Sequence, residues 1–151
     1  ERKKYMEGKR AAAAGVQRGR PKGVKAVRKP EYWDVTITFI RGMDLLAKDE
    51  TGTSDPYVRV VPVSRSGTKI KNRAIETAVV EETCAPSWDE DLKFVVDATH
   101  MASIEATVMD SNRHKEHEPL GSFQIPMKTL LDGSNGNKIY KLEGVERGRV
   151  V

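Results

Sequence analysis

Apolar and polar residues alternate along many short stretches of the chain after residue 30. In residues 35–40, which read Val-Thr-Ile-Thr-Phe-Ile, apolar side chains recur at every second position, the period of a strand with one buried face. Stretches rich in Val, Ile, Thr and aromatic residues predict strands at 34–41, 57–63, 75–81, 91–97, 103–109, 121–126, 138–142 and 147–151. A short helical turn is predicted at 127–131. Eight short strands with so little helix predict an all-β fold, an eight-stranded antiparallel β-sandwich.

The first thirty residues lack this alternation and are strongly basic. Eleven of the 26 Lys and Arg, but two of the 22 Asp and Glu, lie in this segment, so its net charge is about +9, against about −5 for the remainder. We predict a basic arm at residues 1–30 and one folded domain at residues 31–151. The composition of residues 1–14 favours helix, whereas the Gly- and Pro-rich residues 15–30 favour an extended chain.

Within the arm, residues 18–23 read Arg-Gly-Arg-Pro-Lys-Gly and resemble an AT-hook, a short DNA-binding peptide. Gly and Pro keep such a backbone extended, so that Arg18 and Arg20 can enter a narrow, negative minor groove. The alternative, which we favour, is a general polyanion-binding tail that uses Arg18, Arg20 and Lys22. Its partner would be an acidic protein, a nucleic acid or an anionic lipid.

Composition also limits the classes of function. The single cysteine, Cys84, cannot form an internal disulfide and suits a reducing compartment. The His and Cys residues lack zinc-ligand spacing, and no nucleophile–base pair or Gly-rich phosphate loop is present in the sequence. We therefore predict no enzyme, and an intracellular protein that is cytoplasmic or peripherally associated with membrane or cytoskeleton. Because the first residue is Glu1, we expect a larger polypeptide or assembly.

An acidic stretch lies between two of the predicted strands. Asp49 and Asp55 stand six residues apart with Gly52 between them, so the chain can fold back and bring both carboxylates towards one point. Carboxylate oxygens that converge in a loop are what a hard cation such as calcium needs. The sequence therefore predicts one half of a calcium site here.

Four segments carry a family resemblance. Residues 54–57, Ser-Asp-Pro-Tyr, resemble the Ser-Asp-Pro-Tyr signature of C2 domains. Residues 85–90, Ala-Pro-Ser-Trp-Asp-Glu, resemble that family's Asn-Pro-x-Trp-Asn-Glu segment. Residues 106–110 and 119–123 resemble its next two landmarks, in the same order. The resemblance covers about residues 33–151 and implies a calcium- and phospholipid-binding β-sandwich. Since the residues before Trp33 predict a poor strand, the strand order resembles the type II form.

The resemblance also implies five metal-site positions. The first loop supplies Asp49 and Asp55, and the third loop supplies Asp110, Asn112 and Glu118. Asn112 offers an oxygen without charge, and Glu118 is one methylene longer than the family's aspartate. Two alternatives remain open: one weakly bound calcium ion, or a polar loop end that binds none.

Contact with a membrane would depend on charge, because the tips of these loops lack a hydrophobic anchor. Arg113 and Lys115 can attract anionic head groups. A second basic patch is formed by Lys69, Lys71 and Arg73, near the strand that carries a phosphoinositide-binding cluster in some relatives. The alternative for these three residues, a solvated strand face, is the one that we favour.

Two functions of different classes follow. One is a non-catalytic module that targets anionic phospholipid membranes with at most weak calcium dependence. The other is a calcium-independent structural subunit of a large assembly, anchored by its basic arm to an acidic partner such as nucleic acid, a ribosome or a microtubule.

Overall fold

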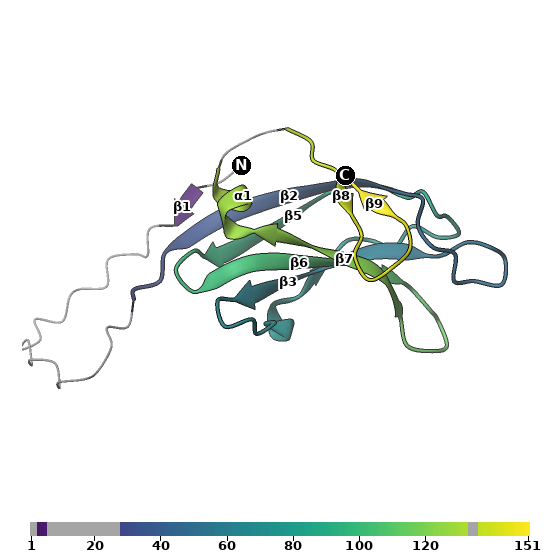
Figure 1. Cartoon of the computed structure of the whole chain (residues 1–151), viewed down its shortest axis with the longest axis horizontal. Helices are drawn as coiled ribbons and strands as arrows, with labels where there is room; N and C mark the ends of the chain where they lie inside the picture. Colours follow the sequence, from purple (N-terminus) through teal and green to yellow (C-terminus); the bar gives the residue numbers. More distant parts are fainter. Residues whose placement is uncertain (1–2, 6–27, 133–135) are drawn as a thin grey trace, which may run out of the picture.

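The computed structural model describes residues 3–5, 28–132 and 136–151, the first of these segments by its backbone alone. The described residues form two antiparallel sheets packed face to face (Figure 1). One sheet contains β1 (Lys3–Tyr5), β2 (Tyr32–Met43), β5 (Ser87–Asp97), β8 (Tyr140–Lys141) and β9 (Arg149–Val150). The other contains β3 (Pro56–Ser64), β4 (Ile75–Glu76), β6 (Met101–Asp110) and β7 (Glu118–Pro126). The predicted antiparallel β-sandwich is confirmed, with β2 to β9 as its eight strands.

The alternation of apolar residues explains the core. Val35 and Phe39, on the inner face of β2, are buried, whereas Thr38 points outward and donates a hydrogen bond to Asp91 of β5 (2.6 Å). The other sheet contributes residues of the same kind, and the core includes Val58, Val60, Val96, Ile104, Val108, Leu120, Phe123 and Ile125. Each fully buried side chain of this size stabilises the fold by roughly 1.5–3 kcal/mol.

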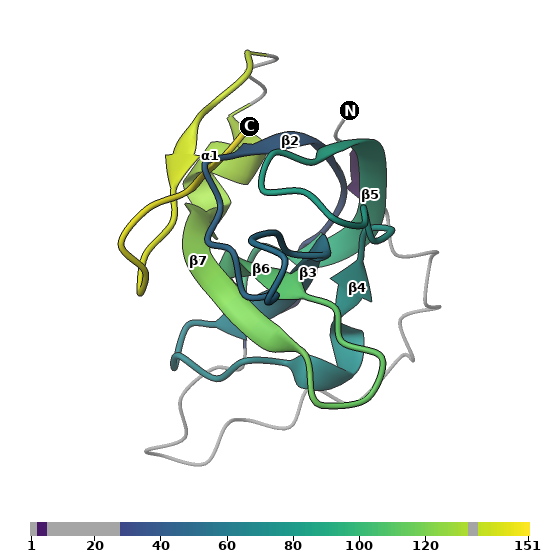
Figure 2. The ribbon, with the colours of Figure 1, turned by 90° about the vertical axis from the view of Figure 1, so that its right-hand side faces the viewer.

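The long pairings run the length of the sandwich and separate its two ends. The β2–β5 register extends from Tyr32 opposite Asp97 to Arg41 opposite Ser87, and β6 pairs on its two sides with β3 and β7. Loops that follow β2 and β6 therefore meet at one end, which faces the viewer in Figure 2. The turn between β5 and β6 lies at the other end (Figure 1).

Two predictions about local structure are wrong. Lys71–Arg73 forms a turn of 3-10 helix, η1, so the expected alternating strand face of the basic patch does not exist. The strand predicted at 75–81 is reduced to β4 (Ile75–Glu76), although residues up to Val80 stay beside β3 through hydrogen bonds from Thr77 N and Val80 N. By contrast, the predicted helical turn is confirmed as α1 (Met127–Leu131).

Two segments distant in sequence share one edge of β2. β1, a strand in a segment whose composition favours helix, pairs with residues 32–34. β9 pairs with Gly42 and Met43. Among the described residues, no strand pairs with the part of this edge between them, and a hollow of about 530 Å³ lies beside it, lined partly by Val35 and Ile125. Because short strands from both ends of the chain, β1 and β9, adjoin β2, the pairing fits either strand order, and the type II form stays a prediction.

Candidate metal centre

Three loops form one end of the sandwich, which we call the cation pole. The first loop (residues 44–55) joins β2 to β3, the second loop (77–86) joins β4 to β5, and the third loop (111–117) joins β6 to β7. The loops lie together in Figure 2. The antiparallel pairing of β3 with β6 places Pro56 opposite Asp110, so the end of the first loop and the start of the third are neighbours.

Three aspartates converge at this pole. Asp49, Asp55 and Asp110 each offer one carboxylate oxygen, and these oxygens lie within 4.8 Å of one another. Asp110 is almost completely buried, with 1% of its surface exposed. Its Oδ1 accepts a hydrogen bond from Asp55 N (2.8 Å), whereas no described residue hydrogen-bonds its buried Oδ2. A buried oxygen without a partner is costly, so this arrangement favours a ligand that supplies positive charge.

The first loop is folded by its own short-range hydrogen bonds. Asp49 N donates to Thr53 O (2.9 Å), and Gly52 N donates to Asp49 O (3.0 Å) in a turn where Gly52 has φ +83°. Glycine adopts this backbone conformation without the strain that a side chain would cause. The buried Ser54 donates from Oγ to Leu46 O (2.7 Å) and closes the loop. The fold-back expected from Gly52 therefore takes place, and Asp49 approaches Asp55.

The second loop contributes to the site through its backbone, which the sequence did not indicate. Glu82 N donates to Asp55 Oδ1 (2.7 Å), and Thr83 N donates to Ser54 O (2.8 Å). The first bond holds the Asp55 carboxylate, and the second holds the backbone of the preceding residue. No residue-type pattern could have revealed them, because every residue except proline carries a backbone N–H.

Electrostatics at the cation pole disfavour the charged form of Asp110. Burial is the main factor that raises the pKa of this carboxyl above its ordinary value, and the negative charges of Asp49, Asp55 and Glu118 raise it further. The hydrogen bond from Asp55 N acts in the opposite direction and lowers it. A bound cation would relieve both the burial cost and the repulsion.

Two of the five predicted metal ligands lie outside this trio. Asn112 donates from Nδ2 to Glu116 O (3.1 Å), so its amide braces the third loop. Glu118, the first residue of β7, is ion-paired with Lys115, with Nζ 3.4 Å from Oε1. The structure therefore brings three of the five residues together, and the roles of Asn112 and Glu118 as ligands stay predictions.

A tyrosine–histidine contact fastens the third loop to β3. The hydroxyl of Tyr57 is 2.6 Å from Nδ1 of His117, and the two rings meet edge to face at 5.5 Å. A tyrosine hydroxyl is protonated at neutral pH and can donate, and burial raises the pKa of Tyr57 further. Sequence reasoning assigned no role to His117, because the contact spans sixty residues of sequence.

The predicted anion-binding residues fall into separate groups. Arg113 is exposed at the cation pole and lies 3.5 Å from a carboxylate oxygen of Glu81. Lys69 pairs with Glu105 (2.9 Å), whereas Lys71 and Arg73 are exposed on η1. The three arm residues of the predictions lie outside the described residues: Arg18, Arg20 and Lys22.

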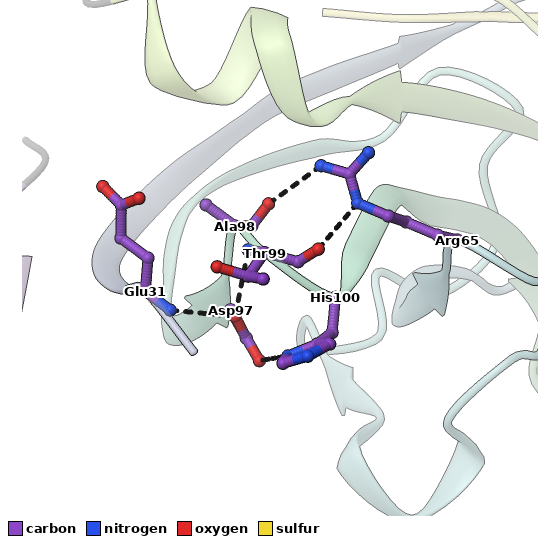
Figure 3. A network of polar contacts seen from close by, with 6 residues as sticks. All are labelled: Glu31, Arg65, Asp97, Ala98, Thr99 and His100. Carbon is purple, nitrogen blue, oxygen red and sulfur yellow. Dashed lines mark hydrogen bonds and ion pairs between the residues drawn. The ribbon is translucent and has the colours of Figure 1, made fainter. Parts of the chain in front are cut away.

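The opposite pole contains another well-buried aspartate in a different environment (Figure 3). Asp97 Oδ1 accepts hydrogen bonds from Glu31 N (3.1 Å) and Thr99 N (3.0 Å), and its Oδ2 contacts His100 Nδ1. Arg65 donates from Nε to Thr99 O (2.7 Å) and ties β3 to the same turn. Burial alone would raise the pKa of Asp97, but the three hydrogen bonds outweigh it and lower the pKa.

Comparisons with known proteins agree with this architecture. The model of the C2 domain family matches residues 33–142. Synaptotagmin-3 of Arabidopsis thaliana is 30% identical over 115 residues, which are 76% of this chain and 20% of that protein. Synaptotagmin-1 of Homo sapiens is 27% identical over 143 residues, 88% of this chain and 33% of that protein. The chain thus spans a fifth to a third of these two relatives.

Solved structures show the same fold. A single C2 domain of plant Extended Synaptotagmin 1 superposes with a TM-score of 0.62 at 25% identity and covers 82% of this chain and 92% of that chain. The calcium-bound pair of C2 domains of Extended-Synaptotagmin 2 superposes with a TM-score of 0.62 at 23% identity, covering 78% of this chain and 42% of that chain. Among the described residues, no helix has the length and apolar character needed to span a membrane.

Proposed function

The chain belongs to the C2 domain family, and we propose that it is a non-catalytic module that docks its cation pole on anionic membrane lipids with at most weak calcium dependence. The observation that carries this proposal is the trio Asp49, Asp55 and Asp110, with oxygens within 4.8 Å of one another and one buried oxygen without a hydrogen-bond partner among the described residues. An acidic pole approaches an anionic surface more readily when its own negative charge is balanced, by a bound cation or by nearby basic residues.

Calcium fits this donor set. It is a hard cation that takes carboxylate, carbonyl and water oxygens, and when bound it supplies the charge that neutralises the trio. Asp49, Asp55 and Asp110 would hold it, and Glu118 lies near enough for its charge to act on Asp110. Because Asn112 brings no charge and its amide nitrogen already bonds the third-loop backbone, we expect one ion at most, bound weakly.

Contact with the lipid would be electrostatic. Residues at the tip of the first loop are polar or glycine, among them the exposed Glu50, Thr51 and Gly52. Arg113 and Lys115 are exposed on the third loop, and each such cation near an anionic surface contributes about 1 kcal/mol of attraction. The exposed basic residues of η1 (Lys71–Arg73) offer a second, separate place for an anionic head group.

The segregation of charge along the chain favours a second candidate function. A net charge of about +9 on residues 1–30, followed by about −5 on the remainder, suits a structural subunit anchored by its arm to an acidic partner. Nucleic acid, a ribosome and a microtubule have the required negative charge. In this function calcium plays no part, and Arg18, Arg20 and Lys22 carry the binding.

Co-sedimentation with vesicles containing anionic lipid, with calcium or with a chelator, separates the two functions. The full chain is compared with Asp55→Asn and with a triple variant in which Arg18, Arg20 and Lys22 become Gln. Membrane docking by the cation pole predicts that calcium increases binding and that Asp55→Asn removes the increase. Binding that ignores calcium and Asp55→Asn but disappears in the triple variant would reject cation-pole docking and support the arm.

A further inference from the structure

Lys115 and Glu118 form an ion pair at the rim of the cation pole. The Lys115 Nζ lies 3.4 Å from Glu118 Oε1, and the side chains are 63% and 41% exposed. Both residues therefore reach solvent, and the ion pair can open without unfolding its surroundings. Surface pairs of this kind contribute only about 0–1 kcal/mol, which makes them easily displaced by a competing charge.

Glu118 lies beside the trio without joining it. The β6–β7 register places Glu118 directly opposite Asp110, and its negative charge contributes to the raised pKa of that carboxyl. Yet Glu118 is absent from the set of carboxylate oxygens that lie within 4.8 Å of one another. The Glu118 side chain is thus within electrostatic range of the trio, while one of its carboxylate oxygens, Oε1, is paired with Lys115.

The backbone around this pair is restrained. His117 is fastened to Tyr57 at 2.6 Å, and Asn112 Nδ2 bonds Glu116 O at 3.1 Å. The third loop is therefore closed on both sides of Lys115, and reorganisation can be confined to the side chains of Lys115 and Glu118. A cation at the trio and the ammonium group of Lys115 would then compete for one carboxylate.

From these contacts we infer that Lys115 is an internal latch on the cation site. Lys115 holds Glu118 while the trio binds no cation, and cation binding releases Lys115 towards anionic lipid. The inference rests on the proposed function and adds a regulatory link to it. Coupling of this kind is reciprocal, so an anionic surface that attracts Lys115 also frees Glu118 and strengthens cation binding. One residue would thereby couple the two ligands.

The other third-loop cation provides a matched comparison. Arg113 carries the same charge on the same loop, but its partner is Glu81 on the second loop, at 3.5 Å, and Glu81 does not belong to the trio. A second comparison is Lys138, paired with Asp132 at 3.8 Å near α1, with exposures of 43% and 42%. Both allow the latch to be separated from a general effect of charge.

The test is a calcium titration of the full chain without lipid, by isothermal calorimetry. Lys115→Gln is expected to tighten calcium binding by about two- to fivefold, Arg113→Gln by less, and Lys138→Gln not at all. In the Glu118→Gln background, Lys115→Gln should tighten binding no more than Arg113→Gln does. Equal tightening by Lys115→Gln in both backgrounds would mean a general charge effect and would overturn the latch.

A second measurement needs no calcium. Vesicles of neutral and anionic phospholipid are mixed with each variant in the presence of a chelator. Glu118→Gln should raise binding by about two- to fivefold, because Lys115 is freed, and the added Lys115→Gln should cancel the gain. Unchanged binding of Glu118→Gln would overturn the latch.

The two ideas fail differently. In one outcome the wild-type chain binds calcium, while the effects of Lys115→Gln and Glu118→Gln on calcium affinity simply add in the double variant. This result rejects the latch and leaves the proposed function standing. Absence of calcium binding in the wild-type chain and in all four single variants rejects the cation site itself, and the latch with it.

Discussion

The two ends of the sandwich each contain a buried aspartate at the end of a strand, and these two carboxylates differ in how they are satisfied. Asp97 ends β5, and both of its oxygens have partners, in Glu31, Thr99 and His100. Asp110 ends β6 and is more deeply buried, yet one oxygen has no hydrogen bond from any described residue. The pKa of the first is lowered and that of the second is raised.

We connect this difference with the two roles that we propose, a structural one for Asp97 and a cation-binding one for Asp110. Asp97 contributes to folding because the protein itself supplies the donors that stabilise its charge. Asp110 costs folding free energy in its charged form because it is buried and no described residue hydrogen-bonds its Oδ2. Four tests probe this contrast, in decreasing order of expected effect.

Asp97→Ala should cause the largest loss of stability. It removes hydrogen bonds to two backbone N–H groups and to His100, and we expect the free energy of unfolding to fall by about 2–3 kcal/mol. Urea denaturation measures this loss. Asp91→Ala, which removes an exposed carboxylate of the same strand, is the control and should cost less than about 1 kcal/mol; equal losses would mean that the opposite pole has no special role.

Asp110→Asn should have opposite effects on calcium binding and stability. Loss of one carboxylate charge should weaken calcium binding by about tenfold or more, or about 1.4 kcal/mol. Without calcium the same change should stabilise the fold by up to about 1 kcal/mol, because a neutral amide replaces a buried, repelled charge. Calorimetry and thermal unfolding with a chelator measure the two effects, and destabilisation would contradict the contrast between the poles.

The pH dependence of stability should separate the same two residues. Asp97 has a lowered pKa in the folded state, so its contribution is present above the ordinary carboxyl pKa of about 3.9 and is lost as pH falls through the folded value. Asp110 has a raised pKa, so its cost is present at neutral pH and disappears as pH falls. Unfolding of Asp97→Asn, Asp110→Asn and the wild-type chain between about pH 3 and 7, the range that brackets these carboxyl titrations, should show both trends without calcium.

Tyr57→Phe should have the smallest effect. It deletes the hydroxyl that contacts His117 and keeps the aromatic ring, so we expect a loss of about 0.5–1 kcal/mol in stability. Calcium binding should weaken by less than about threefold, since no ligand is removed. A loss of calcium affinity as large as that of Asp110→Asn would show that the fastening of the third loop, and not the trio, limits binding.

The sequence predicted much of this molecule because its clues were local. Alternation of apolar residues predicted the sandwich, and Gly52 between Asp49 and Asp55 predicted a folded acidic loop. Asp110 was identified through the family resemblance, by its place in a recurring segment. The 3-10 turn at Lys71–Arg73 escaped prediction, because the same residues also fit an exposed strand.

What the sequence determined by itself is the fold and the location of the acidic loops, because strand period, turn residues and charge act over a few neighbouring positions. Only the tertiary structure decided which carboxylates meet and which are satisfied. Glu82 N reaches Asp55 across 27 residues, and Glu31 N reaches Asp97 across 66. Asp97 and Asp110 are the same residue type, and their surroundings distinguish them: Asp97 has partners both in the adjacent turn, Thr99 and His100, and in the distant Glu31, whereas Asp110 Oδ2 has none among the described residues.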